Sequence, residues 1–313
     1  MSESVLHRFI IPSAFILLWS SAFIATKYGV LYAPPLAILA VRMVLVVIFL
    51  GGWLLWRHGV SAFGAMSLVT AGGQMLVGLL IHVCYLGGVF FAIDRGMDVG
   101  VAALIVGLQP ILTAWLAAWL FREQLTLVAI VGLCLGLVGL YVVVESRFGV
   151  GAQEISTAGT AAIVIALAGI SSATLLQKRL GQQGLMLMNT WVQYVAAALG
   201  FLSVSLLTET WNFDLQLPLF VALGWMVFAI SLGAIPLLML MIRAGEATRV
   251  SSLFYLVTPV TALLAWLFFD EQLSVASWLG MGLVVVGVAL VVTPKGPQPD
   301  SVGQVERLKL YRR

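Results

Sequence analysis

Apolar residues gather along the chain in ten long runs that are nearly free of charge. The runs cover residues 10–28, 35–56, 68–92, 100–121, 126–144, 160–177, 185–207, 217–242, 250–269 and 274–293. A helix needs roughly 20 apolar residues to cross the hydrocarbon core of a bilayer, whereas a barrel strand needs only about 10. The pattern therefore predicts an all-α polytopic membrane protein with ten transmembrane helices.

The amino-acid composition also indicates a membrane protein. The 313 residues are 62% hydrophobic and 9% charged, whereas soluble domains are about 45–50% apolar and about 25% charged. A globule in water could not bury so much apolar surface. Cys84 and Cys134 both lie inside apolar runs, so we expect no disulfide, no metal site and no cofactor. These features exclude a cytosolic enzyme and a nucleic-acid-binding protein, and they leave the lipid bilayer and a small molecule as partners.

The basic residues between the runs predict the orientation in the membrane. With the N-terminus in the cytoplasm, 12 of the 16 Lys and Arg residues fall on the inner side and only Lys27, Arg95 and Arg147 fall outside. Arg42 lies within the second run. Cytoplasmic loops carry an excess of Lys and Arg, so both termini are expected in the cytoplasm, including the basic tail, residues 294–313.

The two halves of the chain resemble each other in sequence. Residues 104–110 align with 253–259, and Glu-Gln-Leu-Thr at 123–126 aligns with Glu-Gln-Leu-Ser at 271–274. The offset is 149 residues for the first pair and 148 for the second. Each unit contains an odd number of runs, five, so the second unit must be inverted relative to the first. Inverted repeats are typical of secondary transporters, whose site lies near the midplane between the repeats.

This repeat divides the chain into two five-helix units, residues 1–150 and 151–293, followed by the tail. The interiors of the fifth and tenth runs carry almost no polar side chains and are interrupted mainly by glycines, with Gly132 matching Gly280 and Gly139 matching Gly287. Small residues let helices approach closely in a membrane. We therefore expect these two helices to be peripheral braces or a dimer face, in a monomer or a homodimer.

Several motifs carry a family resemblance. They are Leu-Leu-Trp-Ser-Ser-Ala-Phe at 17–23, Pro-Pro at 34–35 followed by Arg42, and the pairs Pro110/Glu123 and Pro259/Glu271. With these residues the chain resembles the EamA type of the drug/metabolite transporter superfamily over about residues 10–293. Members of that family often have Glu before the fourth-span proline, where this chain has Gln109.

The resemblance implies a secondary transporter of the cytoplasmic (cell inner) membrane. It would export a small organic metabolite, such as an amino acid, by alternating access. A drug or toxic-compound efflux carrier and a facilitative uniporter are the alternatives. An intramembrane enzyme or a channel is remote, because the runs contain no His-Glu-x-x-His or Gly-x-Ser-x-Gly motif and no filter loop.

Polar and aromatic side chains inside the runs indicate which helices line a pathway. Gln74, Gly78, His82 and Tyr85 recur at the spacing of one helix face. The residues expected along the substrate pathway are Trp19, Arg42, Gln74, His82, Tyr85, Gln109, Asn189, Gln193 and Tyr255. The residues expected to act as hinges are Pro110, Pro236 and Pro259.

The charged and titratable residues have two interpretations each. Arg42 either caps carbonyls or reaches outward to Asp94 or Asp98, or it contacts an anionic group of the substrate. His82 is either a neutral wall residue or the carrier of a coupling proton, because imidazole changes charge near neutral pH. Glu123 and Glu271 lie at span ends and are expected to anchor the membrane interface.

Overall fold

The computed structural model describes most of the chain. The described residues are 10–64, 66–121, 126–148, 156–180, 185–235, 237, 241, 247–271 and 274–292. Within these ranges all regular structure is helical and no strand is present, which confirms the prediction of an all-α protein. Glu123, Pro236 and the predicted tail, residues 294–313, lie outside the described residues.

The helices follow one another in long antiparallel segments. They are α2 (Ile11–Tyr32), α3 (Pro35–His58), α4 (Ser61–Gly64), α5 (Leu68–Gly78), η2 (Leu79–Leu86), α6 (Gly87–Asp94), α7 (Val99–Gly107), α8 (Gln109–Phe121), α9 (Leu127–Phe148), α10 (Thr157–Leu180), α11 (Met186–Thr208), α12 (Leu217–Gly224), η3 (Trp225–Ala234), α14 (Ala247–Phe269) and α15 (Val275–Val292).

Seven helical segments among the described residues are long and apolar enough to cross a membrane. They are Ile11–Tyr32, Pro35–His58, Leu68–Asp94, Val99–Leu120, Thr157–Leu180, Met186–Thr208 and Leu217–Ala234. Three further apolar helices are shorter, at Leu127–Val143, Leu256–Phe269 and Val275–Val291. Many large apolar side chains on the helices are exposed, among them Trp56, Leu127 and Val275. Such a surface suits a lipid environment better than water.

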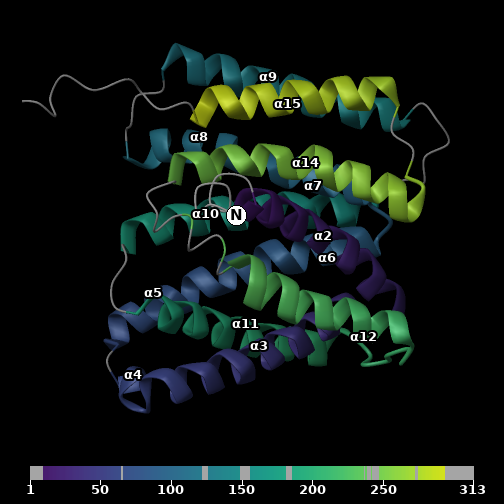
Figure 1. Ribbon diagram of the computed structural model, residues 1–313. Helices are drawn as coiled ribbons and strands as arrows, with labels where there is room; N and C mark the ends of the chain where they lie inside the picture. Colours follow the sequence, from purple (N-terminus) through teal and green to yellow (C-terminus); the bar gives the residue numbers. More distant parts are fainter. Residues whose placement is uncertain are drawn as a thin grey trace, which may run out of the picture.

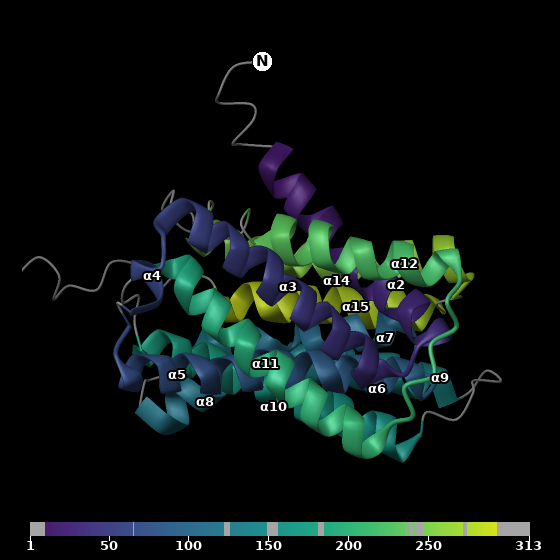
Figure 2. The ribbon, with the colours of Figure 1, turned by 90° about the horizontal axis from the view of Figure 1, so that it is seen from below.

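The helices pack side by side as a bundle (Figure 1). At one edge α9 and α15 lie against each other, and at the opposite edge α3 lies alongside α11. The view from below shows α3 and α11 running next to each other along that face (Figure 2). α2, α10 and α14 lie between the two edges.

Glycines bring α9 and α15 into close contact. A Cβ atom on Gly132 would lie 2.5 Å from the carbonyl oxygen of Gly287, and one on Gly139 would lie 2.5 Å from that of Gly280. The lower-numbered glycine of α9 therefore faces the higher-numbered glycine of α15, so the two helices are antiparallel. Their place at one edge fits the expectation of peripheral braces, although Val291 of α15 reaches the cavity described below.

Short polar caps fix where several helices begin. Hydroxyl oxygens accept hydrogen bonds from backbone N–H groups two or three residues later at the starts of α5, α9, α10 and α15. The capping residues are Ser67, Thr126, Ser156 and Ser274. Two other helix starts are capped by distant acids. Glu209 accepts from the N–H groups of Leu36 and Ala37 at the start of α3, and Glu271 does the same at the start of α7.

Three local departures from a regular α-helix are present, and two of them, the π-helical segments, were not predicted. The segment Leu68–Asp94 contains η2, and the segment Leu217–Ala234 contains η3. The segment Val99–Leu120 is interrupted at Leu108, between α7 and α8, directly before Gln109 and the predicted hinge Pro110. Proline lacks a backbone N–H and disfavours helical geometry in the residue before it. Pro259, in contrast, lies inside a continuous α14.

Candidate functional site

A cavity of about 640 Å³ lies between helices from both halves of the chain. Side chains of α2, α3, η2, α6, α8, α10, α11, η3, α14 and α15 line it, together with Ile235. Five of the residues that the sequence places along the pathway are among them, and so is one predicted hinge. These are Trp19, Arg42, His82, Tyr85 and Gln109, with Pro110.

Arg42 projects from α3 into this cavity and is only 5% exposed. Its Nη2 donates a hydrogen bond to the hydroxyl of Ser231 in η3, at 3.1 Å. Its Nε has no acceptor among the described residues. No described carboxylate pairs with it, and Asp94 instead lies 3.6 Å from Arg95. The guanidinium is therefore a buried cation whose one described hydrogen bond goes to a neutral group.

Aromatic side chains line the cavity together with Arg42. His82 of η2 stacks on Tyr194 of α11, with ring centroids 4.6 Å apart. Tyr85, one turn from His82, also lines the cavity. All four side chains are buried. They form a polar wall whose formal charge comes from Arg42.

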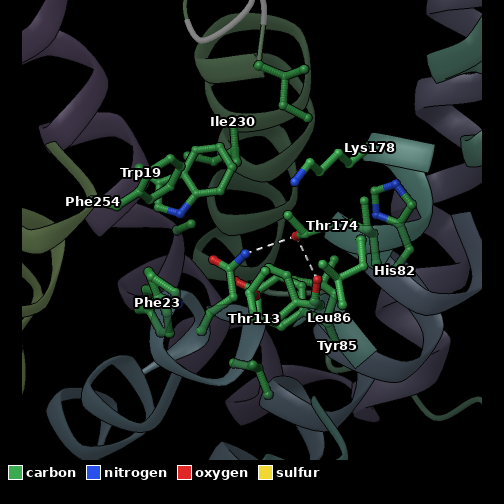
Figure 3. A pocket seen from close by; sticks show the side chains of 18 of the residues that line it. Trp19, Phe23, His82, Tyr85, Leu86, Thr113, Thr174, Lys178, Ile230 and Phe254 are labelled. Carbon is green, nitrogen blue, oxygen red and sulfur yellow. Dashed lines mark hydrogen bonds between the residues drawn. The ribbon is translucent and has the colours of Figure 1, made fainter. Parts of the chain in front are cut away.

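The opposite side of the cavity is aromatic and apolar. Trp19 and Phe254 lie together on one side, while His82 and Lys178 lie on the other (Figure 3). The rings of Trp19 and Phe254 meet edge to face at 5.2 Å, and Phe15 packs behind both at 5.3 Å. Aromatic pairs of this geometry are stable packing units. The cavity thus has a rigid apolar face across from its cationic one.

Neutral polar groups and a second cation line the cavity toward one end of the bundle. Gln109 donates to the hydroxyl of Thr174 at 2.9 Å. Lys178 follows one turn later on α10, close to the end of that helix, and its side chain is exposed. Ala117, near the end of α8, also lines the cavity. We call this the Lys178 end of the bundle, where an exposed residue, Lys178, lines the cavity.

The other end of the bundle, which we call the Lys27 end, contains a partly buried ion pair. Lys27 Nζ lies 2.6 Å from Glu271, whose side chain is 6% exposed. Glu271 also accepts from the N–H groups of Val99 and Gly100 at the start of α7. Lys27 lies over the ring of Phe269, 4.5 Å from its centroid. These contacts tie α2, α7 and α14 together. The role of Glu271 as an interface anchor stays a prediction, and its carboxylate lies buried beside the ammonium group of Lys27.

Three of the predicted pathway residues are not among those that line the cavity. Gln193 donates to Gln74 at 2.7 Å and to Gln177 at 3.1 Å, linking α11, α5 and α10. Asn189, one turn before Gln193, is buried. The expected single face of the third span is divided because η2 follows directly after Gly78. A π-helix takes more residues per turn than an α-helix, so His82 and Tyr85 point into the cavity while Gln74 points toward α11.

The remaining predicted residues fall partly outside the described part of the chain. Tyr255 lies in α14, but its side chain is outside the described residues, as is Pro236. Pro110 lines the cavity at the start of α8, and Pro259 lies inside α14.

Sequence reasoning missed three residues of the wall: Tyr194, Phe254 and Lys178. Tyr194 offered a signal, since a tyrosine in the middle of a span lies away from the interfacial belts that tyrosines usually occupy. Lys178 was counted as a loop charge. Its match to Lys27 in the repeat, at an offset of 151 residues, was the signal there.

The donor set of the site does not suit a metal ion. Among the described residues, His, Cys, Asp and Glu side chains form no group of three or more that could hold one. The cavity can instead bind an organic solute through one charged group, several neutral polar groups and an aromatic face.

Comparison with known proteins identifies the relatives of this chain. The model of the EamA-like transporter family matches it twice, over residues 9–145 and 157–293. An uncharacterized transporter of Bacillus subtilis is 25% identical over 93% of this chain and 94% of its own length.

Two relatives have more specific names. A probable amino-acid metabolite efflux pump of Salmonella typhimurium is 24% identical over 88% of this chain and 92% of its own length. An S-adenosylmethionine/S-adenosylhomocysteine transporter of Chlamydia trachomatis is 27% identical over 88% and 85%. A protein of known crystal structure shares the fold at 20% identity, with a TM-score of 0.62, over 90% of this chain and 94% of that one.

Proposed function

The chain belongs to the EamA-like transporter family, and on that premise we propose that it exports a small organic metabolite, such as an amino acid, by alternating access. It is a multi-pass membrane protein of a transporter family. Beyond this family membership we propose the direction of transport, the substrate class, the transport mechanism and a location in the cytoplasmic membrane.

The observation that carries the proposal is the 640 Å³ cavity. Trp19 and His82 come from the first segment matched by the family model, whereas Lys178 and Tyr194 come from the second. A site shared by two halves is what alternating access requires, because rocking one half against the other exposes the site to each side in turn. The volume lies within the range of small-molecule pockets.

The names of two relatives support the substrate class and direction. The Salmonella typhimurium protein is named a probable amino-acid metabolite efflux pump, and the Chlamydia trachomatis protein a transporter of S-adenosylmethionine and S-adenosylhomocysteine. The apolar, aromatic side of the cavity also suits amphiphilic drugs, so drug efflux is the second candidate.

Ten spans in two inverted five-span units, residues 1–150 and 151–293, are part of the proposal. The two matches to the family model fall within these units. The third span of each unit contains a π-helical segment, η2 in the first and η3 in the second.

The glycine contacts also support this symmetry. An offset of 148 equates Gly132 with Gly280 and Gly139 with Gly287. When the two units are exchanged, Gly132 takes the place of Gly280, and Gly287 takes the place of Gly139. The contact between Gly132 and Gly287 then becomes the contact between Gly280 and Gly139. Both contacts occur, as an axis in the membrane plane requires.

The excess of Lys and Arg supports an orientation with both termini in the cytoplasm. In that orientation the Lys178 end faces the cytoplasm and the Lys27 end faces outward. The cavity is then open inward and closed outward by the contacts of Lys27 with Glu271. In the outward-open state, these contacts would separate. Coupling to protons stays a prediction, as does the alternative of a uniporter.

A growth screen tests the proposed function. A strain overexpressing the protein is exposed to toxic amino acids, nucleosides and drugs, beside a strain expressing Ala114→Trp, which places an indole where Ala114 lines the cavity. We expect the parent protein to raise tolerance to a toxic amino acid and Ala114→Trp to lose that effect at equal membrane abundance. Tolerance to drugs alone would favour the second candidate, and no change in tolerance to any compound would contradict export.

A further inference from the structure

We propose that Arg42 forms an anion subsite in the cavity and that the substrate is an amphipathic carboxylate. The carboxylate binds the guanidinium beside His82 and Tyr194, and the apolar body of the substrate packs against Trp19 and Phe254. This inference rests on the proposed function, because it names the chemical class of the molecule that the same cavity carries.

The first argument is the incomplete pairing of Arg42. A buried charge is unfavourable unless it is paired and hydrogen-bonded, and an arginine at depth in a membrane is costly by at least about 2.5–3.5 kcal/mol on insertion scales. Arg42 is 5% exposed, donates to the neutral Ser231, and has an Nε with no described acceptor. Its side chain lines the cavity, so an acceptor within the cavity can reach it.

The second argument is the charge of the whole wall. Two cations, Arg42 and Lys178, line the cavity, and no Asp or Glu is among its described lining residues. Two described carboxylates make contacts elsewhere: Glu271 pairs with Lys27, and Glu209 accepts hydrogen bonds from backbone N–H groups at the start of α3. A low-dielectric cleft lined by one sign of charge concentrates solutes of the opposite sign.

The third argument is the choice of residue. A guanidinium offers a planar fork of donors that matches the two oxygens of a carboxylate, and hydrogen bonds between ionised groups are roughly twice as strong as neutral ones. The stacked rings of His82 and Tyr194 line the same cavity as this guanidinium. Trp19 and Phe254 lie across the cavity from His82 (Figure 3). A ligand that reaches both sides needs one anionic end and one apolar end.

Binding of a matched pair of probes to the full chain tests the subsite. The probes are 3-phenylpropionate and its methyl ester, which share an apolar ring but differ in charge, and affinity is measured by calorimetry in detergent. We expect the acid to bind the parent protein at least about tenfold more tightly than the ester. Arg42→Gln should remove this preference, and Arg42→Lys should restore only part of it, since lysine keeps the charge but loses the fork.

Two further variants separate the subsite from general effects. Arg57→Gln removes an exposed cation from the same helix and should keep the preference for the acid. Phe254→Ala should weaken binding of acid and ester equally, because the ring contacts only the apolar body.

Two results with the parent protein alone would overturn the subsite, so the test does not depend on the folding of Arg42→Gln. One is equal affinity for the acid and the ester, and the other is no binding of the acid at millimolar concentration. A preference that survives in folded Arg42→Gln would overturn it as well. The proposed function fails separately. A protein that prefers the acid but exchanges no screened solute across vesicles contradicts transport and keeps the subsite. A protein that exchanges solutes without preferring the acid contradicts only the subsite.

Discussion

At the scale of single residues, the chemistry of the cavity is concentrated around Arg42. Ser231 of η3 accepts its one described hydrogen bond, and His82, Tyr85 and Tyr194 line the same cavity. His82 is the one histidine among the residues that line the cavity. Since no carboxylate is among those described residues, His82 is the residue to test as the carrier of a coupling proton.

Replacing His82 tests the predicted coupling to protons. The variant His82→Gln keeps a polar side chain of similar reach, but an amide does not change charge with pH. We expect counterflow of substrate to persist, because it needs no net proton movement, and the response of net flux to a pH gradient to disappear. The measurement is flux in vesicles with and without that gradient. A parent protein without such a response would favour the uniporter alternative, and an unchanged response in His82→Gln would contradict the role of His82 as proton carrier.

Part of the site could be predicted from the sequence because polar residues in apolar runs are costly. That argument found Arg42, His82 and Gln109, all of which line the cavity. It also selected Gln74 and Gln193, which hydrogen-bond to each other instead. Spacing along one helix does not reveal whether a buried amide faces a cavity or another amide on a neighbouring helix.

At the scale of helices, contacts of two kinds hold the bundle together. The seam between α9 and α15 consists of small residues in direct backbone contact, whereas the Lys27 end is held by an ion pair and a capped helix start. The first kind of contact suits a fixed brace, because close packing has no easy alternative arrangement. The second suits a contact that separates and re-forms.

The fixed brace is tested at Gly280. In Gly280→Ala the added Cβ would lie 2.6 Å from Val143 Cγ2 and 2.7 Å from the carbonyl oxygen of Gly139. Overpacking of this kind destabilises by roughly 1–3 kcal/mol, so the thermal unfolding midpoint in detergent should fall by several degrees. Gly282→Ala is the control on the same helix, since no atom lies within 4 Å of its added Cβ. Equal midpoints for the two variants would contradict the close seam.

The separable contact is tested at Glu271. In Glu271→Gln the side chain loses the charge that pairs with Lys27, so the Lys27 end should open more often. A cysteine at Thr26, a buried lining residue, reports this opening in a background where Cys84 and Cys134 are serine. We expect a membrane-impermeant maleimide added from outside to label it severalfold faster than in the parent.

The control for this labelling is Asp214→Asn, which neutralises an exposed carboxylate in the segment between α11 and α12. It should leave the labelling rate unchanged. The same rate in Glu271→Gln and the parent would show that the ion pair does not keep this end closed.

The helices themselves were largely predictable, because roughly 20 consecutive apolar residues allow only a spanning helix. The predicted second run, 35–56, corresponds to α3 at Pro35–His58. The π-helical segments and the break at Leu108 could not be predicted in this way. They depend on how a span packs against its neighbours, whereas hydropathy records only that the span is apolar.

At the scale of the whole molecule, two halves that match the same family model line a shared cavity. Side chains from both matched segments line that cavity, and at one end α2 of the first half is tied to the residues after α14 of the second. A single rocking motion can then close one end while it opens the other.

The orientation is tested by reporter fusions. Fusions after Arg57, Arg122, Arg179 and Arg249 should report the cytoplasm, and fusions near Arg147 and Asp214 should report the outside, because the basic residues favour the first set for the inner face. A C-terminus outside the cell would contradict both the ten spans and the inverted repeat.

The most direct test of transport by alternating access is counterflow in proteoliposomes. Vesicles loaded with an excess of an unlabelled solute selected by the growth screen are placed in a trace of the labelled solute. We predict a transient accumulation of label above its equilibrium level with the parent protein and with Leu120→Trp, which alters an exposed residue of α8 outside the cavity lining. Ala114→Trp should abolish it. Flux without any overshoot, rising linearly with solute concentration, would indicate a channel and contradict the account.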